Sequence, residues 1–145
     1  MILPQSHTLT TRHLNRVFDN TVATYKYYWF LSILDACVKQ GKSRINVWDI
    51  MISMVANAWY PVNYFRLSFG KSESLYDAIL TLQREYNIPI NIGISELTEL
   101  LQTLVQRREV RRMLNFLKQN VPFRFLRPWI DTSDDRQTVL RSQTF

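Results

Sequence analysis

The sequence predicts an all-α protein, a compact bundle of about four to six helices around one core. The 145 residues contain three glycines, too few for the turns of a β-sandwich or for a glycine-rich phosphate loop. Apolar residues make up 46% of the chain and recur at the three- and four-residue spacing of helices. We expect one helical domain over residues 1–130 and a polar tail or linker over residues 131–145.

Two helices are predicted in the N-terminal part. The first is short, begins at Thr8 or Thr10 and ends near Phe18, because threonine is a favoured residue before a helix. The second spans residues 19–40, since "DNT" is a start signal and Gly41 is a favoured residue just after a helix end.

Over residues 27–34 the second helix is apolar on every face, which predicts a central helix of the core. We interpret its aromatic side chains as core packing; a base-stacking surface is the alternative, but no basic cluster adjoins them. Cys37 also lies in an apolar run, so we expect a buried, unreactive thiol. The regularly spaced apolar positions are Val22, Tyr25, Trp29, Ile33 and Ala36.

Cellular location follows from two features of the chain. A single cysteine and the lack of a signal peptide predict a reducing cytoplasm. The longest uncharged apolar run, "YYWFLSIL", has eight residues, whereas a bilayer requires about 20. We therefore expect no membrane span.

A third helix is predicted over residues 45–59, with Asn46 before its first turn and its end before Pro61, because proline disfavours helical geometry in the preceding residue. The segment 60–71 reads as an aromatic connector. Trp59–Phe65, "WYPVNYF", is a candidate protein-binding surface, with peripheral core packing as the alternative.

The C-terminal half predicts two more helices. One spans residues 72–86, and the other spans residues 95–120, capped by Ser95, bent or restarted near residues 107–109 and ended by Pro122. The apolar stripe of the longer one comprises Leu97, Leu100, Leu101, Leu104, Val110, Met113 or Leu114, and Leu117.

The net charge of +6 is concentrated in residues 106–128, which contain seven basic residues and one acidic residue, Glu109. The rest of the chain carries equal numbers of basic and acidic residues. Arginines four residues apart form one patch on a helix and repel one another, which an anionic partner such as DNA phosphate would relieve. The alternative is a solvated face, or ion pairs with Glu85, Glu96 or Glu99. The predicted nucleic-acid-binding residues are Arg107, Arg108, Arg111, Arg112, Lys118, Arg124 and Arg127.

Three segments carry a family resemblance: "VFDNTVATYKYYWFLSILD" (17–35), "ANAWYPVNYFRLSFGKSESL" (56–75) and "NVPFRFLRPW" (120–129). Together they resemble the N-terminal region of a family of uncharacterised bacterial HNH-type endonucleases, in the same order and with similar spacing. The resemblance covers roughly residues 15–129. It implies a role in bacterial restriction or defence.

In that family the nuclease motif, with two histidines, an asparagine and a metal ion, lies downstream of this region. The only histidines here, His7 and His13, precede the resemblance, so no catalytic residue transfers to this chain. Asp134 and Asp135 are adjacent in the polar tail, a poor arrangement for acid–base catalysis. We expect no enzymatic activity, no cofactor and no metal site in this chain.

The leading hypothesis is therefore a non-catalytic recognition module that contacts DNA phosphates while a downstream nuclease domain cuts. The alternative is a protein-interaction, regulatory or homodimerisation module without DNA contact. Salt-dependent DNA binding would favour the first and a concentration-dependent dimer the second.

Overall fold

The computed structural model describes residues 11–17, 25–67, 74–126 and 128. These residues form helices, with no β-strand among them, as predicted. The elements are α1 (Arg12–Val17), α2 (Tyr25–Leu34), the π-helical turn η1 (Asp35–Lys39), α3 (Val47–Asn63), α4 (Ser74–Glu85), α5 (Ile94–Leu104) and α6 (Arg108–Leu126).

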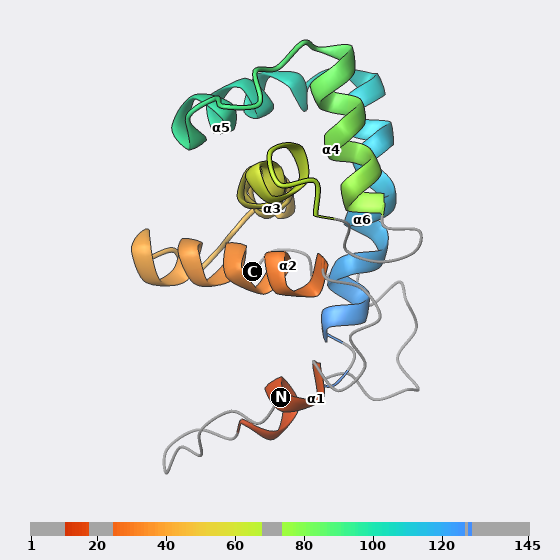
Figure 1. Cartoon of the computed structure of the whole chain (residues 1–145). Helices are drawn as coiled ribbons and strands as arrows, with labels where there is room; N and C mark the ends of the chain where they lie inside the picture. The colour runs from red at the N-terminus through yellow and green to blue at the C-terminus, as the bar shows by residue number, and fades with distance from the viewer. Residues whose placement is uncertain (1–10, 18–24, 68–73, 127, 129–145) are drawn as a thin grey trace.

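Helix α3 is the centre of the bundle. It packs against α2, α4, α5 and α6, and Figure 1 shows it nearly end-on between them. Met51, Met54, Val55, Ala58 and Trp59 are all completely buried along it. The core is therefore built around α3, and the expectation that the helix containing Trp29 would be central is wrong.

Helix α2 covers α3 with one face only. Trp29 on the inner face is 0% exposed, whereas Leu31 of α2 is 42% and Val38 of the following turn η1 is 76% exposed. Cys37 is also exposed, so the prediction of a buried thiol is wrong. The reason is that the apolar run supplies two faces, while α3 lies against one of them.

One helix end, at Gly41, and one helix start, at Asn46, lie where the sequence predicts them. Gly41 has φ +62°, the left-handed conformation that glycine adopts without strain. The Asn46 side chain accepts a hydrogen bond from the Trp48 backbone N–H at 2.8 Å and caps α3. The predicted start at Thr8 or Thr10 and the polar tail lie outside the described residues.

Both predicted proline stops are wrong, because Pro61 lies inside α3 and Pro122 lies inside α6. A proline within a helix removes one hydrogen bond and costs about 3 kcal/mol. The buried neighbours Trp59 and Val62, and likewise Val121 and Phe125, offset this cost through packing. Tertiary burial therefore carries both helices past the residues that would end them in isolation.

The single helix predicted over residues 95–120 is in fact two helices, α5 and α6. The break between them lies close to the predicted restart near residues 107–109. Val105 ends α5 by donating its N–H to the Leu101 carbonyl at 2.9 Å, and the Arg107 carbonyl accepts the Arg111 N–H at 3.0 Å as α6 begins. Gly93, not Ser95, precedes the first residue of α5, and no side chain caps it. The predicted stripe is confirmed for Leu97, Leu101, Leu104, Val110, Leu114 and Leu117, which are buried, whereas Leu100 is half-buried against the core.

Candidate nucleic-acid interface

The basic cluster lies at the start of α6. Arg107 immediately precedes the helix, and Arg108, Arg111 and Arg112 occupy its first turns, all four exposed. The N-terminus of a helix carries a partial positive charge, so cations there are unfavourable by about 0.3–1 kcal/mol each. Glu109 is the one acidic residue in this first turn. The chain therefore gathers positive charge where the backbone already repels it.

No carboxylate forms a salt bridge with these arginines within the described part of the chain. The salt bridge found there joins Lys39 and Asp35 at 2.8 Å. The alternative that Glu85, Glu96 or Glu99 pairs with the cluster is therefore not found among these residues. The cluster's positive potential remains available to an external anion.

Aromatic rings lie beneath three of the cations. The Arg107 Cζ atom lies 5.4 Å from the centroid of the Tyr86 ring, just beyond the end of α4. The Arg111 Cζ atom and the Lys118 Nζ atom lie 5.3 and 5.0 Å from the centroid of the Trp48 ring, in the first turn of α3. These distances are those of cation–π contacts.

Arg111 also joins the two C-terminal helices. Its Nε–H donates to the Val105 carbonyl at 3.0 Å, one of the carbonyls left without a partner where α5 ends. The terminal nitrogens of the guanidinium retain their N–H donors. Arg111 is thus both a structural residue of the α5–α6 junction and a member of the basic cluster.

Arg124 is separated from the cluster. It lies twelve residues after Arg112 on α6, about 18 Å along the helix axis. Its guanidinium donates to the Tyr25 hydroxyl of α2 at 3.0 Å. The structure thus brings together Arg107, Arg108, Arg111, Arg112 and Lys118 and leaves Arg124 at the other end of α6; Arg127 lies outside the described residues.

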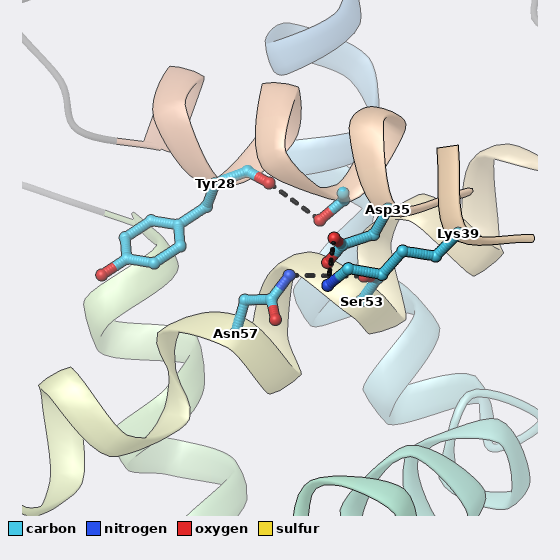
Figure 2. Close-up of polar contacts among 6 residues, drawn as sticks. Tyr28, Asp35, Lys39, Ser53 and Asn57 are labelled. Carbon is cyan, nitrogen blue, oxygen red and sulfur yellow. Dashed lines mark hydrogen bonds and ion pairs between the residues drawn. The ribbon is translucent and has the colours of Figure 1, made fainter. Parts of the chain in front are cut away.

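A polar group between α2 and α3 is drawn in Figure 2. The Ser32 hydroxyl donates to the Tyr28 carbonyl at 2.8 Å, and Asn57 Nδ2 donates to Ser53 Oγ at 3.5 Å. Each contact joins residues four apart on one helix, as the Asp35–Lys39 pair also does. In these contacts the serine hydroxyls bind a carbonyl and an amide, not a histidine that could activate them as nucleophiles. We therefore interpret the contacts as local stabilisation of each helix.

Metal-binding geometry is not found in the described ranges, which hold no group of three histidine, cysteine, aspartate or glutamate side chains suited to an ion. His13 Nδ1 lies 2.7 Å from the Pro128 carbonyl oxygen, which ties α1 to the residues after α6. His7, Asp134 and Asp135 lie outside the described residues. No described helix has both the length and the apolar character needed to cross a bilayer.

Sequence reasoning missed two sets of residues. Trp48 and Tyr86 carry no local signal for cation contact, because their partners are 21 or more residues away in the chain. The exposed apolar stripe on α2 and η1 did have a signal, its alternating four- and three-residue spacing. This α2 stripe comprises Tyr27, Leu31, Leu34 and Val38.

Some residues of the segment "WYPVNYF" pack in the core, and others lie at the surface, where a protein partner could bind. Trp59 and Val62 are completely buried, whereas Tyr60, Tyr64 and Phe65 are exposed. The ring centroids of Tyr60 and Tyr64 are 6.0 Å apart, and those of Tyr64 and Phe65 are 5.0 Å apart. The exposed rings therefore contact one another at the surface, and the protein-binding interpretation remains a prediction for them.

Comparison with protein-family models, curated protein sequences and solved structures finds no match to this chain. The candidate function therefore rests on the geometry above and on the sequence resemblance.

Proposed function

We propose that this chain is a non-catalytic helical recognition module of an HNH-endonuclease-like protein that contacts DNA phosphates through the start of α6. The observation that carries the proposal is the clustering of Arg107, Arg108, Arg111 and Arg112 at the positive end of a helix, without a carboxylate partner in the described residues. An anion there gains from the arginines and from the helix dipole together.

The chemistry suits phosphate more than a single carboxylate. Arginine presents a planar fork of donors that matches phosphate oxygens, and successive phosphates along DNA can engage several arginines at once. Such contacts supply affinity and position without reading sequence. A downstream nuclease domain would supply the cutting, as the resemblance implies.

DNA titrations at several salt concentrations test this proposal. Changing Arg108 and Arg112 together to alanine should weaken binding about tenfold or more and make the salt dependence shallower by about two phosphate contacts. Arg12→Ala/Arg16→Ala on α1 is the matched control, because it removes two exposed positive charges remote from the cluster. Equal affinity and equal salt dependence of the double variant and the wild type would refute the proposal.

The non-catalytic part has its own test. Purified chain incubated with DNA and Mg²⁺ or Mn²⁺ should leave the DNA intact, as seen by gel electrophoresis. DNA cleavage activity that stays with the chain through further purification would show that the non-catalytic assignment is wrong.

The α2 stripe favours the alternative function, homodimerisation. Its four large apolar side chains are 40–76% exposed at coiled-coil spacing, and the adjacent charges of Asp35 and Lys39 already neutralise each other. A second copy could cover this face without bringing unpaired charge together. Light scattering over a range of protein concentrations tests it, and a dimer lost on changing Leu31 to Asp would support the alternative.

A further inference from the structure

One indole ring of α3 contacts two cations that lie two turns apart on α6. Arg111 and Lys118 are seven residues apart in sequence, about 10 Å along the helix. Both nevertheless lie close to Trp48, with 5.3 Å from Arg111 Cζ and 5.0 Å from Lys118 Nζ to the ring centroid. The two side chains therefore converge on one ring instead of projecting separately into solvent.

The position of this ring is fixed by its own helix. Trp48 is the second residue of α3, and its backbone N–H is bound by the Asn46 side chain. Its neighbours Val47 and Ile50 are buried in the core at 7% and 1% exposure. The first turn of α3 is thus anchored, and the indole is a platform on the most central helix of the bundle.

Contact with the ring leaves the cations able to bind an anion. A guanidinium that stacks by its face keeps its in-plane N–H donors. Within the described residues, Arg111 donates from Nε to the Val105 carbonyl. Lys118 is half-buried, and its ammonium over the ring keeps donors that can point away from it. By contrast, Arg108 and Arg112 are exposed, and no ring among the described residues contacts them.

We propose that Trp48 is a positioning residue that orders Arg111 and Lys118 for contact with the phosphates of a nucleic-acid strand. The inference rests on the DNA-binding function proposed above. A long flexible side chain loses conformational freedom when it binds, and this loss weakens association. Because Trp48 restricts both side chains before DNA arrives, part of that loss is incurred on folding instead.

The test compares Trp48→Leu with Trp48→Phe in DNA titrations at several salt concentrations. Trp48→Leu leaves the net charge unchanged but removes the aromatic face, so we expect affinity to fall about tenfold and the salt dependence to become shallower by about one to two phosphates. Trp48→Phe retains a weaker aromatic face and should lose only about two- to threefold. Tyr64→Leu is the control, because that exposed ring contacts Tyr60 and Phe65.

The outcomes separate this inference from the function on which it depends. If Arg108→Ala/Arg112→Ala weakens binding while Trp48→Leu binds like Tyr64→Leu, the positioning role is wrong and DNA binding stands. If the wild type binds DNA without salt dependence, the proposed function itself fails.

A measurement without DNA covers the case in which Trp48→Leu does not fold. In the wild-type chain the side-chain protons of Arg111 and Lys118 should show upfield ring-current shifts in NMR spectra. In Trp48→Phe these shifts should become smaller. Random-coil shifts for both side chains in the wild type would overturn the inference.

Discussion

The two ends of α6 carry the same kinds of residue in opposite surroundings. At its start, Arg108 and Arg112 are exposed and repel both each other and the helix terminus. Near its end, Arg124 donates to the Tyr25 hydroxyl, and Phe125 is buried with its ring centroid 5.9 Å from that of Phe30. One end of the helix is electrostatically unfavourable, and the other end is part of the folded core.

This difference shows why a count of positive charges does not define a binding surface. The seven basic residues predicted to bind DNA fall in one short segment of sequence, residues 106–128. One of them, Arg124, instead stabilises the contact between α2 and α6. A side chain that stabilises the fold needs no ligand to explain it. At the start of α6, Arg111 has a fold-supporting bond to the Val105 carbonyl, but Arg108 and Arg112 have no such explanation in the described residues. This is why the proposed function rests on that end of the helix.

The largest effect should come from the core end of the helix. Phe125→Ala removes a ring that is 4% exposed, so the free energy of unfolding should fall by about 3–4 kcal/mol. Phe116→Ala is the matched control on the same helix, because Phe116 is 55% exposed and should change stability little. Urea denaturation measures both, and equal losses would contradict the assignment of the two ends.

A smaller effect is expected from the Arg124–Tyr25 hydrogen bond. Tyr25→Phe and Arg124→Ala should each lower the free energy of unfolding by about 1 kcal/mol, because a bond to a charged donor is lost. The double variant should lose less than the sum of the two. Additive losses in this mutant cycle would show that the two groups do not interact in solution.

The smallest effect should have the opposite sign. Arg108→Gln relieves repulsion at the start of α6, so the free energy of unfolding should rise by about 0.3–0.5 kcal/mol at low salt and by less at high salt. Arg16→Gln, in the last turn of α1 where a cation is favourable, should instead lower it slightly. Destabilisation by Arg108→Gln would indicate a fold-supporting role for this arginine.

Local signals predicted the helical class and several boundaries. Gly41, the Asn46 cap and the leucine stripe of α5 and α6 lie where the sequence placed them, because each depends on residues within a few positions. The continuation through Pro61 and Pro122 was not predictable in this way. It depends on burial against other helices, which a local pattern does not contain.

The candidate site was predictable in composition but not in arrangement. The excess of positive charge near Arg108 is visible in the sequence, whereas the contacts of Arg111 and Lys118 with Trp48 join segments 63 and 70 residues apart. The exposed side of α2 was missed for a related reason. The sequence shows which residues are apolar, but only the packing shows which of two apolar faces is covered.

The π-helical turn at Asp35–Lys39 has a consequence for how the chain can vary in length. A π-turn contains about one residue more than an α-helical turn. Just after this turn the Lys42 N–H donates to the Ala36 carbonyl at 3.1 Å. Loss of a single residue within this turn would convert it to ordinary α-helix. Tyr25 and Trp29 precede the turn and are buried, so we expect a shortened chain to keep this part of its core and to adjust at Ala36, which is buried within the turn.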